Sequence, residues 1–455
     1  MIAEELANFI VNLDIGDIPQ EVIKKAKLHM LDTIGIMIAV NNFKEIKPLI
    51  ELIKEQGGSQ ESTIIGNKIK VPMLNAVLAN GVMAHSVDYD DTHLGSGIHV
   101  SSTAVVTALA VGEKIGADGK LLISSIVGGY EIGSRLGKAA PWKFHARGFH
   151  PTSVVGVFIS TAVASKLLGL KEDEIVNAFG IAGSFSSGIL QSLDEGVWVK
   201  PFHPAWASHA GIFATLLAKK GYKGPRGVFE GRLGLFNTFL HGENIDYSEI
   251  TKDLGKKWET LNIAIKPYPS CHATHSTIDA MIYAKNTYAV KPEDVEEIIL
   301  YSPKISFDLG LFNEEKVVPK TTYAAKFSAY YTAARALERG YVGIWDFTEN
   351  SITHANTLKL TKKIKGIYEK ELDKYAGENV VPVKANIKIK NGSSYEILII
   401  NHKGTPNNPM SDDDIIFKFK DNINNSIYKD NSREIMKIVL SLEKHKIEEL
   451  INLIN

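Results

Sequence analysis

Residues 151–168, Pro151-Thr-Ser-Val-Val-Gly-Val-Phe-Ile-Ser-Thr-Ala-Val-Ala-Ser-Lys-Leu-Leu168, decide the fold of this chain. Proline suits the first position of a helix, and the residues that follow are apolar or small almost without interruption. The Gly, Ala and Ser side chains in such a segment let neighbouring helices approach closely. The stretch therefore predicts a helix inside a packed, buried bundle.

The rest of the first 260 residues follows a similar pattern. Apolar residues recur at spacings of three and four, with start signals such as Asp17-Ile-Pro19 before the first long run. Helices are predicted over residues 22–40, 72–87, 101–115, 120–136, 171–184 and 204–219. Strand patterns are nearly absent from this part of the chain. We expect a mainly α fold.

The pattern changes after Lys266. A helix is predicted over residues 272–288, and the alternation in residues 295–302 is typical of a half-buried strand. Residues 385–390 and 394–400 flank Asn391-Gly392, which favours a hairpin with a type I′ turn. Helices return at 412–422 and 432–451. We therefore predict a helical domain built from residues 1–265 and 405–455, with a smaller α+β lid domain, residues 266–404, inserted in it.

Composition excludes several classes of protein. The 455 residues are 44% hydrophobic and carry a net charge of −1, so the chain lacks the basic excess that nucleic acid would require. Cys271 is the only cysteine, which rules out an intrachain disulfide and suits a reducing cytoplasm. The acidic start Met1-Ile-Ala-Glu-Glu5 is unlike a signal peptide, and no apolar run is long enough to span a membrane. We expect a cytoplasmic protein.

Histidine, alone or with lysine, recurs close to expected helix starts. The stretches are residues 88–99, 148–155, 200–209 and 266–275. Helix N-termini carry partial positive charge and unpaired N–H groups. Several of them converging with Lys and His would form a pocket for a small, multiply charged anion, which predicts a carboxylate substrate.

The first stretch contains Asp88, Asp90, Asp91, His93 and His99. A carboxylate there could orient an imidazole and set its tautomer at the mouth of a pocket. The same residue types are ligands for divalent metals, and an acidic capping loop is the plainest alternative.

In the next two stretches, His150 precedes Pro151, and Lys200 and His203 each sit beside a proline. This places His150 at or next to a helix N-cap, where the helix dipole disfavours the protonated ring, as a general base needs. Lys200 could pair with a substrate carboxylate, with His203 close to it. The alternatives are a histidine that only caps its helix and a lysine that faces water.

Cys271, His272 and His275 form the last stretch and are candidate substrate contacts. A Cys/His nucleophilic pair is conceivable, but a cysteine at a helix start is equally a small buried apolar residue. The sequence has no Walker A, G-x-G-x-x-G, H-E-x-x-H or G-x-S-x-G pattern, which disfavours nucleotide cofactors.

Taken with Gly183-Ser-Phe-Ser-Ser-Gly188, Gly227-Val-Phe-Glu-Gly-Arg-Leu-Gly234 and Asn408-Pro-Met-Ser, these stretches resemble the MmgE/PrpD family over nearly the whole chain. That family contains 2-methylcitrate dehydratases, cis-aconitate decarboxylases and an iminodisuccinate epimerase. The resemblance implies a homodimer, a helical domain built from both chain ends, an inserted lid, and no metal or organic cofactor.

The resemblance also assigns catalytic residues. The acid, the two histidines and the lysine of the decarboxylases fall on Asp88, His99, His150 and Lys200, whereas a further decarboxylase histidine falls on Cys271. That departure argues against a faithful cis-aconitate decarboxylase and does not choose among the remaining reactions. The leading prediction is a lyase that dehydrates a tricarboxylate such as 2-methylcitrate. Decarboxylation or epimerisation on the same residues is the alternative. A metal-dependent hydrolase and a non-catalytic carboxylate-binding protein are the more distant ones.

Overall fold

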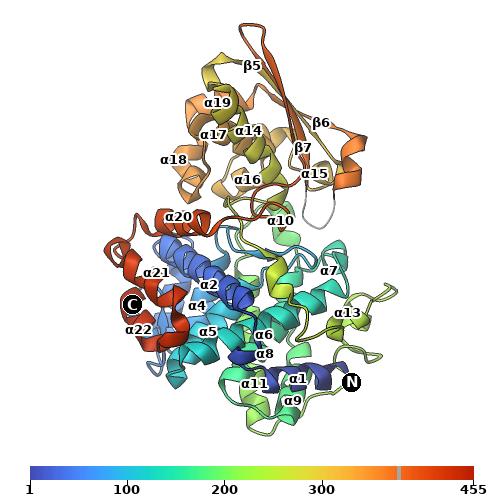
Figure 1. The fold of residues 1–455 in the computed structure, drawn as a ribbon, viewed down its shortest axis with the longest axis vertical. Helices are drawn as coiled ribbons and strands as arrows, with labels where there is room; N and C mark the ends of the chain where they lie inside the picture. The colour runs from blue at the N-terminus through green and yellow to red at the C-terminus, as the bar shows by residue number, and fades with distance from the viewer. Residues whose placement is uncertain (377–380) are drawn as a thin grey trace. The chain divides into compact units, whose positions relative to one another are not determined.

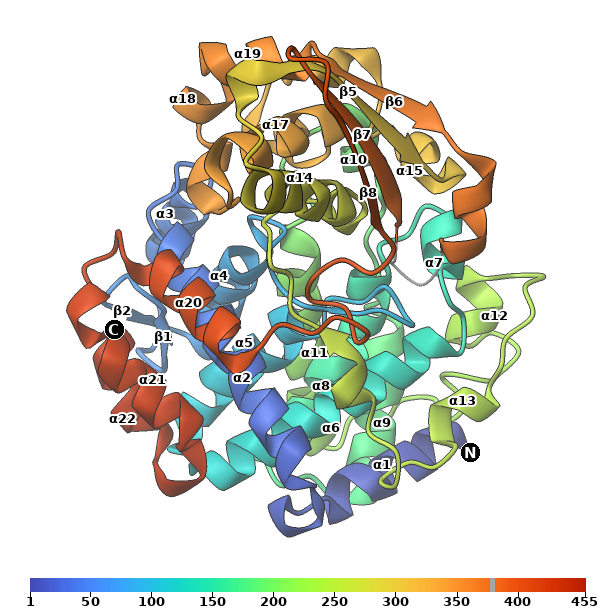
Figure 2. The same ribbon diagram turned by 45° about the horizontal axis from the view of Figure 1, so that its top comes forward.

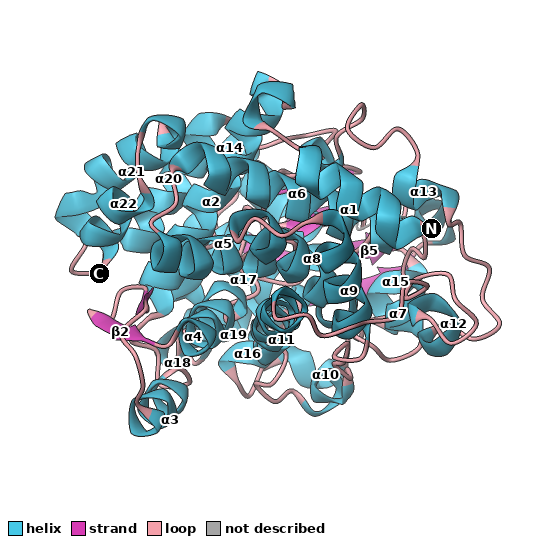
Figure 3. Cartoon of the chain, turned by 90° about the horizontal axis from the view of Figure 1, so that it is seen from below, coloured by secondary structure: helices cyan, strands magenta, loops and turns pink. Residues whose placement is uncertain are grey.

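A computed structural model describes residues 1–376 and 381–455 (Figure 1). Helices dominate it, as Figure 3 shows, so the predicted mainly α fold is confirmed. The chain forms two compact units. Unit 1 comprises Met1–Ser86, Asp90–Ile265 and Ser411–Asn455, and unit 2 comprises Val87–Tyr89 and Lys266–Met410. Within the described residues, no helix is both long and apolar enough to cross a membrane.

Unit 1 is a bundle of helices. Its elements are α1 (Ile2–Asn12), α2 (Gln20–Val40), α3 (Lys47–Gln56), α4 (Met73–His85), α5 (Ser101–Ile115), α6 (Gly119–Lys138), α7 (Lys143–Ala146), α8 (Pro151–Leu167), α9 (Glu172–Gly183), α10 (Gln191–Glu195), α11 (Phe202–Lys219), α12 (Leu235–Phe239), α13 (Ser248–Thr251), α20 (Asp412–Ile423), α21 (Ser432–Leu440) and α22 (Ile447–Ile454). Helix α8 packs against α5, α6, α9 and α11.

Small polar residues let these helices pack closely around α8. Ser160 of α8 donates to the carbonyl of Ser208 in α11 at 2.8 Å and accepts from Thr107 of α5 at 2.9 Å. Each hydroxyl is buried and hydrogen-bonded, so its burial carries no desolvation penalty. The bundle predicted from residues 151–168 is therefore confirmed.

The C-terminal helices pack on the N-terminal ones. Helices α20 and α21 lie along α2, and the Lys418 ammonium in α20 meets the Asp32 carboxylate in α2 at 2.7 Å. The single helix predicted over residues 432–451 is wrong. It breaks after α21 because the carbonyl of His445 accepts a hydrogen bond from Gly119 at 2.9 Å, and Ile447 donates to Ala117 at 3.1 Å.

Short strands interrupt unit 1 where the sequence pattern gave no signal. Strands β1 (Ser62–Ile64) and β2 (Ile69–Val71) pair antiparallel, as do β3 (Thr92–His93) and β4 (Ile263–Ala264). Segments of two or three residues are too short to show alternation. Asp90 and Asp91 lie in the loop that leads into β3. The pairing of β3 with β4 holds this loop beside the last residues of unit 1 before Lys266.

Unit 2 is built around one four-stranded sheet. The strands β5 (Val295–Ser302), β6 (Ile364–Tyr368), β7 (Val383–Ile389) and β8 (Ser394–Ile399) lie in the order β6-β5-β7-β8, with only β5 and β6 parallel. Helix α14 (His275–Tyr288) lies against β7 and β8 (Figure 2). The remaining helices are α15 (Lys304–Asp308), α16 (Thr322–Lys326), α17 (Ala329–Arg339), α18 (Glu349–Ile352) and α19 (Ala355–Thr361).

The predicted strand over residues 295–302 and the hairpin β7–β8 are confirmed, but the type I′ turn is wrong. Asn391 is not among the residues with positive φ, whereas Gly392 has φ +91° and donates to Ile389 at 3.0 Å. This is a three-residue loop, a type I turn followed by a left-handed glycine. The loop therefore has one residue more than the predicted type I′ turn, which joins its strands through two residues.

Candidate functional site

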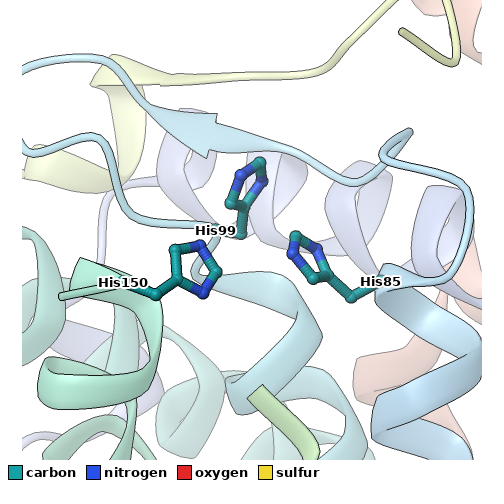
Figure 4. A group of neighbouring side chains, drawn as sticks. All are labelled: His85, His99 and His150. Atoms are coloured by element: carbon teal, nitrogen blue, oxygen red, sulfur yellow. The ribbon is translucent and has the colours of Figure 1, made fainter. Parts of the chain in front are cut away.

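Three buried imidazoles meet in unit 1. His85 is the last residue of α4, His99 lies two residues before α5, and His150 is the N-cap of α8. One ring nitrogen of each lies within 4.8 Å of those of the other two. Figure 4 shows the three rings grouped around one point. We call these residues the unit 1 histidine group.

Hydrogen bonds settle the tautomer of His85. Both carboxylate oxygens of Asp90, a fully buried residue, lie 2.9 Å from His85 Nδ1. A carboxylate only accepts, so Nδ1 carries the proton and the lone pair is on Nε2. This pairing fixes the ring and would stabilise positive charge when Nε2 takes up a proton.

His99 has the same tautomer for a different reason. Its Nδ1 lies 2.9 Å from the backbone carbonyl of Asp91, which can only accept. The lone pair is therefore on Nε2. The backbone N–H of His99 donates to the hydroxyl of Thr152 at 3.1 Å, which ties the start of α5 to α8.

His150 is held at the N-terminus of α8 by its backbone. Its N–H donates to the carbonyl of Gly188 at 2.9 Å. Gly188 has φ +106°, and a Cβ there would lie 2.4 Å from Cβ of Ser153, so only glycine fits. This gives the 183–188 motif a structural role in positioning His150.

The His150 ring is paired with a fourth histidine. Its Nδ1 lies 3.1 Å from Nδ1 of His203, in the first turn of α11. Burial, and next the positive charge of Lys200, lower the pKa of His150 well below its usual value. The same two causes lower the pKa of His203 to about 4. Both shifts favour the neutral ring at pH 7. Burial and Lys200 cause them, whereas the expectation from the sequence rested on the helix dipole; the role of His150 as a base stays a prediction.

Lys200 brings a positive charge to this group. It is buried, two residues before α11, and its charge lowers the pKa of His145 as well as those of His150 and His203. The sequence alternative of a lysine that simply faces water is therefore wrong.

Asp91 and His93 are engaged in internal contacts. The Asp91 carboxylate lies 2.5 Å from His29 Nδ1 and accepts hydrogen bonds from the backbone and hydroxyl of Ser101, at the start of α5. The two ring nitrogens of His93 contact the Ser96 hydroxyl at 2.9 Å and the Glu259 carboxylate at 3.1 Å. These contacts give both side chains a structural role. Substrate binding by Asp91 and His93 stays a prediction.

Asp88 belongs to unit 2, where its partner is a lysine. The ammonium of Lys266 lies 3.2 Å from the Asp88 carboxylate and 3.1 Å from its backbone carbonyl, and both residues are buried. Asp88 has φ +54°, a sparsely populated conformation for a residue with a side chain. Lys326 is also buried here, and burial lowers its pKa to about 7. Lys266 opens the fourth histidine stretch of the sequence, whereas no sequence pattern predicted Lys326.

Cys271, His272 and His275 also lie in unit 2. Cys271 is the N-cap of a short 3-10 helix, His272–Thr274, and His275 begins α14. The two histidine rings lie 4.8 Å apart between centroids, and His402 completes a second group of three. We call His272, His275 and His402 the unit 2 histidine group.

The structure thus brings together His99, His150, Lys200 and His203 of the predicted site residues in unit 1. It adds His85, which pairs with Asp90 of the first stretch. No sequence pattern predicted His85, because it ends a helix, whereas the predicted histidines lie near helix starts. Its signal was the five-residue spacing to Asp90, which a helix end followed by a tight loop brings into contact. The catalytic role of Asp88 stays a prediction.

This site occurs in a chain whose family is established by comparison with known proteins. The model of the MmgE/PrpD N-terminal domain matches residues 4–248, and that of the MmgE/PrpD C-terminal domain matches residues 268–444. The chain belongs to the MmgE/PrpD family, as its motifs indicated.

Known proteins that are similar to this chain match it over nearly its whole length at 25–28% identity. A cis-aconitate decarboxylase-like protein, oryM, of Aspergillus oryzae is 28% identical, covering 100% of this chain and 97% of that protein. The cis-aconitate decarboxylase of Homo sapiens is 27% identical, covering 97% of this chain and 92% of that protein. That of Aspergillus terreus is 25% identical, covering 100% and 96%.

Proposed function

We propose that this protein is a lyase that acts on a small tricarboxylate, and that it decarboxylates an acid of the cis-aconitate type. The observation that carries the proposal is the unit 1 histidine group with Lys200 beside it, in a chain of the MmgE/PrpD family. The names of the relatives favour decarboxylation over the dehydration that the sequence analysis preferred. Dehydration of 2-methylcitrate remains the second candidate.

The charges of the site suit a polycarboxylate. The ammonium of Lys200 can pair with one carboxylate of the substrate, and the N-termini of α5 and α8, beside His99 and His150, attract another. Fixed positive groups of this kind also stabilise negative charge that develops on carbon during the reaction.

The histidines supply proton transfer. When the bond between a carboxylate carbon and its neighbour breaks, carbon dioxide leaves and its electron pair stays on the carbon skeleton, where a proton must quench it. His85 is the best placed donor, because the Asp90 carboxylate stabilises its protonated ring. His85 must regain its proton after each turnover, and His150, with a ring nitrogen within 4.8 Å of one in His85, is the group that can pass it on.

Two related reactions compete on the same residues. Dehydration would use a neutral ring to remove a carbon-bound proton and a protonated ring to assist the loss of hydroxide. Cys271 stands where the resemblance places a histidine of the decarboxylases, which argues against decarboxylation without choosing between dehydration and epimerisation. Epimerisation would need only removal and return of one proton.

A parallel assay separates these reactions. The purified protein is incubated with cis-aconitate, 2-methylcitrate and iminodisuccinate, and the products are followed by mass spectrometry and by release of carbon dioxide. We expect carbon dioxide from cis-aconitate, and its loss in the Lys200→Ala variant. A new alkene from 2-methylcitrate without carbon dioxide would transfer the assignment to the dehydratases.

Four further points are tested simply. Full activity after exhaustive chelation would exclude the metal-dependent hydrolase, and any turnover that Lys200→Ala abolishes would exclude a non-catalytic binding protein. The homodimer is tested by light scattering of the purified chain, and the cytoplasmic location by fractionation of cells that express it.

A further inference from the structure

Helix α2 of unit 1 carries a stripe of polar residues along one face. Most residues of this helix are buried and apolar, yet Lys25, His29 and Asp32 follow one another at spacings of four and three. The Asp32 carboxylate is paired with the Lys418 ammonium. His29 is fully buried, and the proposed reaction does not use it, so its presence in the interior needs an explanation.

His29 is a poor choice for a residue that only fills space. Burial lowers the pKa of His29, and although the Asp91 carboxylate opposes this, the neutral ring is favoured at pH 7. The ring's Nε2 has no hydrogen-bond partner among the described residues. An unmatched polar atom in the interior is costly, and a leucine would avoid that cost. The other ring nitrogen must therefore supply what this histidine contributes.

The other nitrogen holds the side chain of Asp91. His29 Nδ1 lies 2.5 Å from Asp91 Oδ2, a distance at which two lone pairs would repel, so Nδ1 carries the proton. The N–H of Ser101 donates to Asp91 Oδ1 at 3.1 Å, and its hydroxyl donates to Oδ2. Because that hydroxyl has one proton, the Tyr130 hydroxyl donates to it in turn, at 2.6 Å. The Asp91 carboxylate is thus fixed by groups from α2 and α5, the latter supported from α6.

A fixed Asp91 also fixes its backbone carbonyl, which accepts from His99 Nδ1 at 2.9 Å. Two other groups face the same nitrogen. The Thr92 hydroxyl lies 3.2 Å away, and the Asp90 carboxylate, paired with His85, lies 3.6 Å away. A hydroxyl can donate or accept, so Thr92 does not choose a tautomer, and 3.6 Å is too long for a hydrogen bond. The Asp91 carbonyl is therefore the group that keeps the His99 proton on Nδ1 and its lone pair on Nε2.

We propose that His29 is a positioning residue that acts through Asp91 to hold His99 in the tautomer with its lone pair on Nε2. Without the proton that His29 donates, the Asp91 carboxylate turns toward its remaining donors and its backbone carbonyl leaves His99. The Thr92 hydroxyl then donates to His99 Nδ1, the ring proton moves to Nε2, and His99 loses the lone pair with which it would accept a proton. The effect on turnover rests on the proposed function, whereas the effect on the tautomer does not.

The first test reads the tautomer directly. The full chain is labelled with ¹⁵N-histidine, and the ring nitrogens of His99 are assigned by comparison with His99→Gln. We expect the proton on Nδ1 in the wild type and on Nε2 in a large fraction of His29→Leu. His29→Asn, whose amide nitrogen can take the place of Nδ1 and donate to Asp91, should restore the wild-type form. Ser101→Ala removes another donor to Asp91 Oδ2 and gives the same readout as His29→Leu if that variant fails to fold.

The second test measures turnover of whichever of the three acids the wild type converts. In His29→Leu, kcat should fall by about 100-fold, the effect of a displaced catalytic group, with KM within about threefold of wild type. His29→Asn should recover most of this loss. Thr33→Val is the matched control, because it removes a buried hydroxyl of α2 that donates to the His29 carbonyl at 2.8 Å. It should change neither the tautomer nor kcat.

The results that contradict the proposal are distinct from those that contradict the proposed function. A His99 proton that stays on Nδ1 in both His29→Leu and Ser101→Ala would overturn the proposal, as would a proton on Nε2 in the wild type. Equal losses of kcat in His29→Leu and His29→Asn, with the tautomer unmoved, would make His29 a purely structural residue. A wild type that converts none of the three acids would refute the proposed function, and the tautomer would still decide the role of His29.

Discussion

Replacing Asp90 with asparagine tests the role assigned to His85. The two carboxylate oxygens lie 2.9 Å from His85 Nδ1, and asparagine keeps the shape while removing the negative charge. A hydrogen bond to a charged partner is worth about 1.5–3 kcal/mol, so its loss lowers the population of protonated His85 by a factor of about 10–150. Turnover at pH 7 should fall by about the same factor if His85 delivers the proton.

The pH dependence distinguishes this role from a merely structural one. In Asp90→Asn the protonated ring is restored by acid, so the alkaline limb of the rate profile, where turnover falls as His85 loses its proton, should move to lower pH by about one to two units. Carbon dioxide release from cis-aconitate is measured from pH 5 to pH 8. If the new asparagine turned its amide nitrogen toward His85 Nδ1, the ring proton would also move to Nε2. His85 Nε2 would then have no lone pair with which to accept a proton.

Glu259→Gln is the matched control, because it alters another buried histidine–carboxylate pair of unit 1, with His93, outside the unit 1 histidine group. It should cost stability and leave turnover per folded molecule close to that of the wild type. If Asp90→Asn kept turnover within about threefold of wild type with an unmoved pH profile, the assignment of His85 would be refuted.

Three further predictions follow from the same part of the molecule. His150→Ala should lower turnover by about 10²–10⁴, and turnover within about tenfold of wild type would remove His150 from catalysis. The pKa of His203 is lowered from 6.5 to about 4 in the folded chain, so the unfolded chain takes up the proton first as the pH falls. About 3 kcal/mol of the folding free energy present above pH 6.5 should therefore be lost by pH 4. Urea unfolding at pH 7.5 and 5 should show a smaller loss in His203→Gln, and equal losses would contradict the shift. Gly188→Ala should cost about 1–3 kcal/mol in urea unfolding because of its φ of +106° and the contact with Ser153, and an unchanged midpoint would show that the backbone there is free to move.

Much of the helical unit followed from the sequence because its helices are long and strongly patterned. Helix α5 was predicted over its full extent, and α8 to within one residue, since Pro151 fixes its start. The break after α21 was not predictable, because it depends on backbone hydrogen bonds to residues 117 and 119, far away in the sequence. The β3–β4 pair was missed for the same reason.

The site was predicted in part. Helix-start reasoning found His99, His150 and Lys200, whose charge lowers the pKa of both His150 and His203. The sequence patterns did not predict His85 or His402. His85 ends a helix and His402 lies in a loop after β8, and no local pattern marks either histidine as functional. Only the folded chain shows which histidines share a group.

The most direct test of the central claim is product analysis with cis-aconitate, comparing the wild type with His150→Ala. The account predicts one carbon dioxide for each molecule of cis-aconitate consumed by the wild type, with a loss of about 10²–10⁴ in the variant. Equal turnover by the two proteins, or no reaction with any of the three acids, would contradict a lyase built on the unit 1 histidine group.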